Sequence, residues 1–197
     1  NARLIVMKPL VESQNASYLL KELAPSYAIW IYRHYLDVAL SDIKQFSETA
    51  GHGNLLPIIE DEVTNWRMEN LSQEVVNTVK KIYSPALSPL ECACLFWYVR
   101  NSLFFSQDLD KNERVLLWNY ENLMTNPQVY FEQLHQRLSV EIPRNSYQQI
   151  FSNQSIGKQA PLINPKIREL CEAMLLRLDE VHNLKIKPFR LQSNSNV

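Results

Sequence analysis

A short apolar run that ends on an arginine and then changes to a helical pattern constrains the fold more than any other stretch. Residues 28–32 read Ala-Ile-Trp-Ile-Tyr, the β-branched and aromatic composition of a strand buried on both faces. From Tyr35 onward the apolar residues recur at the 3.6-residue period of a helix. A strand that feeds directly into a helix is half of a β-α-β unit, so this run predicts an α/β protein with a parallel sheet.

Arg33 follows that strand directly. In open parallel sheets, ligands bind outside the carboxyl ends of the strands, where the next helix also directs its free N–H groups and its positive dipole end. Ser41 lies near the second turn of the predicted helix, and its hydroxyl can lean back toward Arg33 because helical side chains tilt toward the N-terminus. A guanidinium, a hydroxyl and N–H donors together predict an anion site, with phosphate as the preferred ligand.

A second interpretation of the same residues stays open. Asp37 lies four residues after Arg33, the spacing of an ion pair on a helix surface, so Arg33 is also well placed to be half of a structural salt bridge. A helical serine such as Ser41 is usually exposed or hydrogen-bonded to its own helix.

The remaining pattern predicts one α/β domain over residues 1–190 and a frayed tail over 191–197. Further strands are expected near 3–9, where Pro9 marks the exit, and at 115–120. Helices are expected at 13–23, from the Arg33 strand to 46, at 58–81, and starting at 89, 127 and 164–165. Residues 47–57 contain Gly-His-Gly-Asn and predict a loop. The expected architecture is three layers, with a mainly parallel central sheet flanked by helices on both faces.

Composition limits the kinds of partner. The formal net charge is −1, which gives no support for a general nucleic-acid binder, so any anion site must be local. Three cysteines are an odd number without metal-site spacing, which favours a reducing compartment, hence the cytoplasm, over a disulfide framework or a zinc site. No apolar run approaches the length of a membrane span.

Three stretches in this order resemble the PAPS-dependent sulfotransferases. The first is Arg33-x3-Asp37-x3-Ser41 behind a strand, which is similar to the 3′-phosphate segment of that family. The second is residues 4–10, Leu-Ile-Val-Met-Lys-Pro-Leu, which resembles the strand leading to the acceptor site. The third is residues 114–127, with its tyrosine-acidic-x-leucine turn at 120–123. The resemblance covers about residues 3–181 and implies a P-loop-like sulfotransferase fold.

The resemblance also implies roles for individual residues. Arg33 and Ser41 would hold the 3′-phosphate of the nucleotide, Tyr120 would lie against the adenine, and Lys158 would lie near the 3′-phosphate. Lys8 would lie near the transferred sulfonate. The co-substrate would be PAPS (3′-phosphoadenosine 5′-phosphosulfate), the product PAP, and no metal would be needed.

Two departures from the family pattern concern catalysis. Cytosolic members carry a histidine base two residues after the lysine, where this chain has Leu10. Glu12 is the nearest ionisable substitute if burial raises its pKa, although an exposed acid at a helix start explains it equally well. The family's glycine- and threonine-rich phosphosulfate loop would precede Asn1, so the chain is expected to be a fragment that is N-terminally incomplete and inactive in transfer.

Two functions from different classes follow. The first is a sulfotransferase that moves a sulfonate from PAPS to a hydroxyl or amine of a small-molecule or carbohydrate acceptor. The second is a non-catalytic, sulfotransferase-like anion-binding or interaction module. A P-loop kinase would need Gly-x4-Gly-Lys-Ser/Thr, which the chain lacks. The sequence leaves the acceptor and the oligomeric state open.

Overall fold

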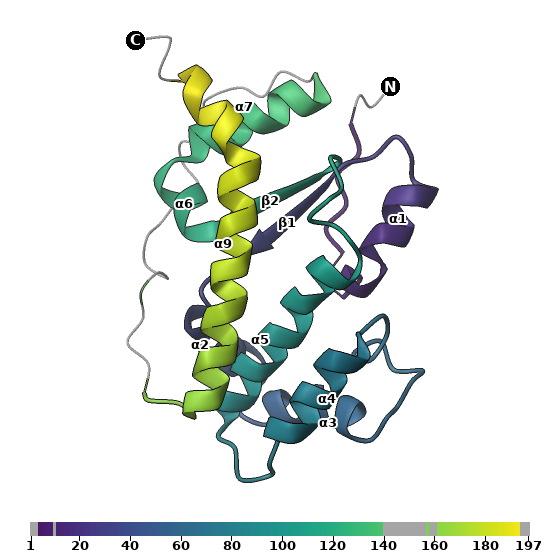
Figure 1. The fold of residues 1–197 in the computed structure, drawn as a ribbon, viewed down its shortest axis with the longest axis vertical. Coiled ribbons are helices and arrows are strands. Elements are labelled where there is room, and N and C mark those ends of the chain that lie inside the picture. The colour runs from purple at the N-terminus through teal and green to yellow at the C-terminus, as the bar shows by residue number, and fades with distance from the viewer. Residues whose placement is uncertain (1–3, 10, 140–156, 158–160, 194–197) are drawn as a thin grey trace.

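The structure is a computed structural model that describes residues 4–9, 11–139, 157 and 161–193. The described part is a mostly helical α/β protein built around one small sheet (Figure 1). The elements in chain order are η1 (Ser13–Asn15), α1 (Ala16–Glu22), β1 (Ala28–Tyr32), α2 (Tyr35–Phe46), α3 (Ala50–Ile59), α4 (Gln73–Ile82), α5 (Pro89–Ser106), β2 (Val115–Asn119), α6 (Tyr120–Thr125), α7 (Pro127–Leu138) and α9 (Pro165–Ser193).

The sheet pairs β1 with β2 in parallel, from Ala28 opposite Val115 to Tyr32 opposite Asn119. The predicted parallel pairing of these two runs is therefore confirmed. Parallel strands need a long crossover connection, and here helices α2 to α5 lie between the strands in the sequence. Both strands consequently end at the same edge of the sheet.

Alternate residues of β2 belong to two different cores, because successive strand side chains point to opposite faces. Val115 and Leu117 belong to the main core, to which α2, α3, α4 and α5 also contribute. Leu116 and Trp118 belong to a second core with Tyr130 of α7 and Ile186 of α9. The long helix α9 runs across the strands and contacts α5, β2 and α7 (Figure 1).

The prediction that β1 is buried on both faces was wrong. Ile29 and Ile31 are 39% and 52% exposed, although their partners in the ladder, Leu116 and Trp118, are buried. The second core, formed with α7 and α9, encloses the β2 side chains and not those of β1. An apolar strand sequence specifies the capacity for burial, and the placement of neighbouring helices decides which side chains are covered.

The strand predicted near residues 3–9 is not formed by residues 4–9, the part of it that the structure describes. Residues 4–9 form no strand and pair with neither β1 nor β2, and Ile5 and Val6 are both 81% exposed. A strand is stabilised by its ladder and by a buried face, and this segment has neither among the described residues. The described sheet is therefore two-stranded, not three-stranded.

Residues predicted to be a loop form α3, and the reason is a close approach of two helices. A Cβ on Gly51 would lie 2.9 Å from the Cβ of Cys92 and 3.0 Å from the carbonyl oxygen of Pro89, so α3 packs against the start of α5 through a position that only glycine fits. The helix predicted over 58–81 is interrupted, since α3 ends at Ile59 and α4 begins at Gln73.

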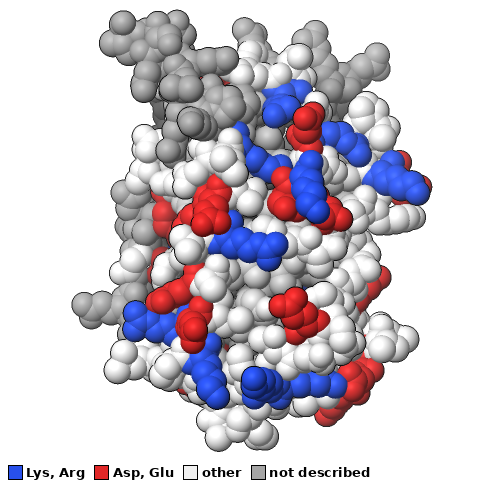
Figure 2. Space-filling model, in the orientation of Figure 1, with Lys and Arg blue, Asp and Glu red and all other residues white. Residues whose placement is uncertain are grey.

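Charge is mixed over the face drawn in Figure 2, where lysine and arginine side chains alternate with aspartate and glutamate. This face carries no extended basic stripe, which agrees with the net charge of −1. Within the ranges that the structure describes, no helix has the length and apolar character needed to cross a membrane.

Candidate functional site

Two strand-to-helix turns meet at the carboxyl edge of the sheet. β1 leads into α2 through His34, whose Nδ1 accepts a hydrogen bond from the Leu36 N–H at 3.3 Å. β2 leads into α6 through Asn119, whose side-chain oxygen accepts from the Asn122 N–H at 2.8 Å. The His34 N–H donates to Glu121 Oε1 at 2.9 Å, which joins the two turns. Capping side chains thus fix both helix starts beside one another.

Arg33 lies at this edge and contacts residues from both turns. Its guanidinium carbon is 4.9 Å from the centre of the Tyr120 ring, a cation–π distance. Its Nη2 is 3.4 Å from Asp37 Oδ2, and the two side chains are 15% and 3% exposed. The Gly157 N–H also donates to Asp37 Oδ2 at 2.9 Å. Two of the four residues predicted to contact the nucleotide, Arg33 and Tyr120, therefore lie together, and the salt bridge of the alternative interpretation is also formed.

The other predicted site residues are placed as follows. Ser41 is half-buried on α2, and none of the described residues hydrogen-bonds to its side chain, so its convergence with Arg33 stays a prediction. Lys8 and Glu12 are exposed, and Glu12 Oε2 accepts from Asn15 Nδ2 at 3.2 Å, the placement of a solvated acid at a helix start. Lys158 and Leu10 lie outside the described residues.

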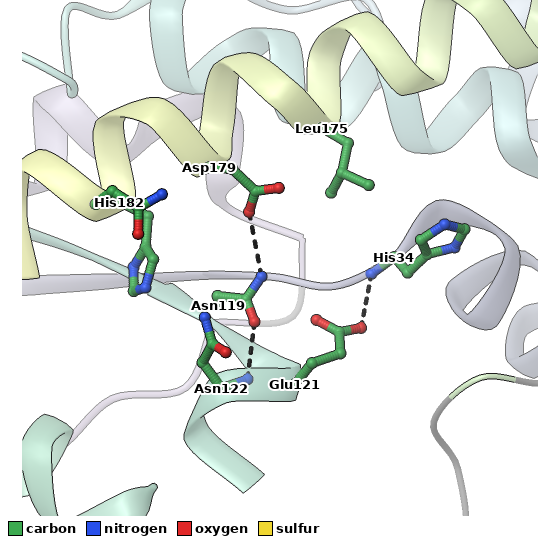
Figure 3. Close-up of a pocket in the computed structure, with 8 residues that line it drawn as sticks. His34, Asn119, Glu121, Asn122, Leu175, Asp179 and His182 are labelled. Atoms are coloured by element: carbon green, nitrogen blue, oxygen red, sulfur yellow. Dashed lines mark hydrogen bonds between the residues drawn. The ribbon is translucent and has the colours of Figure 1, made fainter. Parts of the chain in front are cut away.

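A pocket of about 400 Å³ opens beside these turns, between them and α9 (Figure 3). Figure 3 shows Asp179 extending from α9 and Glu121 extending from α6 toward the space between them, with Asn119 below Asp179. The lining residues are His34, Asn119, Glu121, Asn122, Leu175, Asp179, His182 and Asn183. The position agrees with the general rule that ligands bind at the carboxyl ends of parallel strands.

Hydrogen bonds from the last residues of β1 and β2 hold Asp179 in place. The Tyr32 hydroxyl donates to Asp179 Oδ1 at 2.6 Å, and Asn119 Nδ2 approaches the same oxygen at 3.4 Å. Burial and then the bond to Asp179 raise the pKa of Tyr32 above its ordinary value, so the phenol remains a proton donor. A buried tyrosine hydroxyl needs such a partner, and this one ties α9 to the sheet.

His182 is fixed from two sides and acts as a structural group. His182 is 1% exposed. Nδ1 lies 2.9 Å from the Leu117 carbonyl oxygen, which can only accept, so Nδ1 carries the proton. Nε2 lies 3.1 Å from the Tyr130 hydroxyl. Both nitrogens are therefore engaged with the protein interior.

The cysteines are not poised for nucleophilic chemistry. Cys92, Cys94 and Cys171 are buried and form no disulfide. Burial raises the pKa of Cys92 to about 11 and that of Cys94 to about 12, and it raises the pKa of Cys171 further. Since the thiolate is the reactive form, these side chains act as small apolar groups of the core.

The sequence pattern did not reveal the α9 side of the pocket. Asp179 and His182 border the apolar face that was predicted for this helix, and their spacing places them on one side of it. The signal that was available is Tyr32, a tyrosine at the end of an apolar strand, whose hydroxyl requires an acceptor when it is buried. That signal predicts an acceptor without saying which residue supplies it.

Comparison with known proteins identifies no relative: no family model, no curated protein and no solved structure matches the chain. The resemblance to the sulfotransferases therefore rests on the sequence motifs that contain Arg33, Lys8 and Tyr120.

Proposed function

We propose that the protein is a PAPS-dependent sulfotransferase and that this chain supplies the contacts to the 3′-phosphate and adenine of the donor. The observation that supports the proposal is the placement of Arg33 over the Tyr120 ring at the carboxyl edge of the parallel strands. The two residues come from different strand ends, and the resemblance assigns one to the phosphate and the other to the base.

The chemistry of this edge suits a phosphate. A guanidinium offers paired N–H donors that match phosphate oxygens. The N-terminus of the twelve-residue helix α2 adds its positive dipole end beside Arg33. Asp37 competes for the same guanidinium, so a bound phosphate must share Arg33 with that carboxylate. We therefore expect weak binding of PAP that strengthens when the Asp37 charge is removed.

The transfer itself would be an in-line attack of the acceptor hydroxyl or amine on sulfur. The sulfur–oxygen bond to the nucleotide breaks as the new bond forms, the acceptor proton passes to a base, and PAP leaves. The protein contributes positioning and stabilises the charge on the leaving phosphate oxygen. The glycines are Gly51, Gly53 and Gly157, so these 197 residues hold no glycine-rich cradle for that charge. Loss of one such donor costs about 10²- to 10³-fold in rate, and we expect no transfer by this chain alone.

One observation favours the second function, a non-catalytic module. Asp37 is 3% exposed on its side chain, and it accepts from Gly157 while it pairs with Arg33. This is the arrangement of a structural ion pair that also holds Gly157, 120 residues further along the chain. In this proposal the carboxyl edge of the sheet has retained its fold and Arg33, but it catalyses no sulfonate transfer.

The buried cysteines favour the same cellular compartment for both proposed functions. Three free thiols packed in the core suit a reducing compartment, and we propose a cytoplasmic protein.

The test is calorimetry with PAP, and with 5′-AMP, which lacks the 3′-phosphate. We expect PAP to bind more tightly than 5′-AMP, Arg33→Ala to weaken PAP binding about tenfold or more, and Asp37→Asn to tighten it. The matched control is Arg168→Ala, because Arg168 forms an i,i+4 pair with Glu172 on the exposed side of α9.

Equal binding of PAP and 5′-AMP, or unchanged binding by Arg33→Ala, would contradict a phosphate site. Absence of PAP binding together with a lower melting temperature of Arg33→Ala would support the structural ion pair and the second function. A transfer assay with labelled PAPS checks the expected absence of turnover, since robust transfer would show that the donor cradle lies within this chain.

A further inference from the structure

We infer that the pocket between α6 and α9 binds a primary ammonium group of a ligand. This goes beyond the proposed nucleotide contacts, because Arg33, Ser41 and Tyr120 do not line the pocket. The inference rests on three features of the lining: its charge, the way its carboxylates are held, and the fit of the other groups.

The described lining carries negative charge without a compensating cation. Asp179 and Glu121 are carboxylates, and no lysine or arginine is among the lining residues that the structure describes. The two histidines are committed elsewhere. His34 uses the Nδ1 lone pair to accept from the Leu36 N–H, and His182 is engaged through both nitrogens. Two carboxylates without a partner cation attract a cationic ligand and repel an oxyanion.

Each carboxylate accepts hydrogen bonds from the protein through one oxygen. Its second oxygen is available to a ligand in the pocket. Asp179 Oδ1 accepts from Tyr32 and Asn119, and Glu121 Oε1 accepts from the His34 N–H. No described residue donates to Asp179 Oδ2 or Glu121 Oε2. Figure 3 shows the two side chains approaching the same space from opposite walls. The protein thus preorganises two acceptor oxygens, which reduces the entropy cost of binding a donor group.

An ammonium group fits this lining better than a metal ion does. It brings three N–H donors, which the two free carboxylate oxygens and the amide oxygen of Asn122 or Asn183 can accept. Leu175 gives an apolar wall for the carbon atoms next to the nitrogen. Over the described ranges, no group of three or more His, Cys, Asp or Glu side chains converges as metal ligands, whereas calcium takes six or more oxygen ligands.

The test is an NMR titration of the ¹⁵N-labelled chain with D-glucosamine and, separately, with D-glucose at matched ionic strength. The two sugars differ in one position, where an ammonium replaces a hydroxyl. We expect glucosamine to shift the side-chain amide signals of Asn119, Asn122 and Asn183 in a saturable way, and glucose to bind about tenfold more weakly or not at all. Added salt should weaken glucosamine binding.

Three isosteric variants locate the site. Asp179→Asn and Glu121→Gln each keep an oxygen that can accept the existing hydrogen bonds, and each should weaken glucosamine binding about tenfold. Glu180→Gln is the matched control, because Glu180 is exposed on the same helix and does not line the pocket. It should leave the affinity unchanged.

Several results would overturn the inference. They are absence of a saturable shift, equal affinity for the two sugars, and equal loss of affinity in Glu180→Gln. Displacement of glucosamine by calcium or magnesium chloride at low concentration would show a metal site instead. If Asp179→Asn does not fold because the Tyr32 contact is weakened, Glu121→Gln against Glu180→Gln decides the outcome. The titration contains no nucleotide, so its result is independent of PAP binding.

Discussion

Gly51 and Gly53 occupy the same helix in opposite environments. An added Cβ at Gly51 would meet the Cβ of Cys92 at 2.9 Å and backbone atoms of α5 at 3.0 and 3.2 Å, whereas one at Gly53 would meet nothing within 4 Å. The first glycine is required by packing, because backbone atoms cannot move aside as a flexible side chain can. The second carries only the entropy cost that glycine has in any helix.

This contrast gives a prediction with a built-in control. Gly51→Ala should destabilise the fold by about 1–3 kcal/mol through overpacking. Gly53→Ala should stabilise it by up to about 1 kcal/mol, the difference in helix propensity. Urea unfolding followed by circular dichroism measures both. Equal effects of the two changes would show that α3 does not pack on α5 through Gly51.

Arg33 shows how far a single residue can be interpreted from the sequence. Its position behind a strand predicted a cation at the sheet edge, and Asp37 four residues later predicted a salt bridge. Both are present, because strand ends and i,i+4 spacing are local properties. The partners of Tyr32 and His182 could not be read in this way, since Asp179 and Leu117 reach them through the path of α9 across the sheet.

At the scale of elements, the sequence predicted a helix end correctly where the residues next to that end determine it. Pro89 predicted the start of α5, and α5 begins at Pro89, where the structure also has a capping box between Ser88 and Glu91. Local signals failed for α3, whose glycines predict a loop until packing against α5 is known. They also failed for residues 4–9, whose strand composition has no partner among the described residues. Burial of a strand is a property of its neighbours.

Glu91 links two elements and gives a pH-dependent prediction. Its Oε2 accepts from the Ser88 N–H and hydroxyl at 2.7 and 2.9 Å, and its Oε1 accepts from the Asn164 N–H, just before α9, at 2.8 Å. Burial alone would raise the pKa of Glu91, but the hydrogen bonds from Ser88 and Asn164 outweigh it and lower the pKa below 4.5. The ionised carboxylate is therefore the form that joins α5 to the start of α9.

The sign of the pH effect follows from that shift. A carboxylate with a lowered pKa in the folded state stabilises the fold above its unfolded pKa, and this contribution is lost as pH falls through the folded pKa. We expect Glu91→Gln to be less stable than the natural chain at neutral pH, and the difference to shrink as pH falls below 4.5. Urea unfolding over that range checks this. Glu180→Gln, at an exposed position of α9, should show no such convergence, and a constant difference for Glu91→Gln would contradict the prediction.

At the scale of the whole molecule, α9 makes one folding unit of two cores. Ile167, Cys171 and Leu178 belong to the main core, while Ile186 belongs to the second core with Trp118. Between them, Lys185 Nζ donates to the carbonyl oxygens of Asn112 and Val115 at 2.9 and 3.0 Å, at the entrance to β2. Because one helix contributes to both cores, we expect the two cores to unfold together.

This coupling predicts that a destabilising substitution in the main core also destabilises the second core. Leu178 is fully buried, and Leu178→Ala should cost about 2–5 kcal/mol, a large share of a typical total of about 5–15 kcal/mol. Leu176 is 62% exposed on the same helix, and Leu176→Ala should change stability by less than about 0.5 kcal/mol.

Fluorotryptophan labelling distinguishes the cores during unfolding, because Trp97 lies in the main core and Trp118 in the second. In urea, the native ¹⁹F signals of both tryptophans should disappear at one midpoint, as in a two-state transition. Leu178→Ala should lower that midpoint equally for both, because the helix that loses its anchor in one core also carries Ile186 of the other. A shift of the Trp97 signal alone would mean that the two cores unfold separately and that α9 breaks between Leu178 and Ile186.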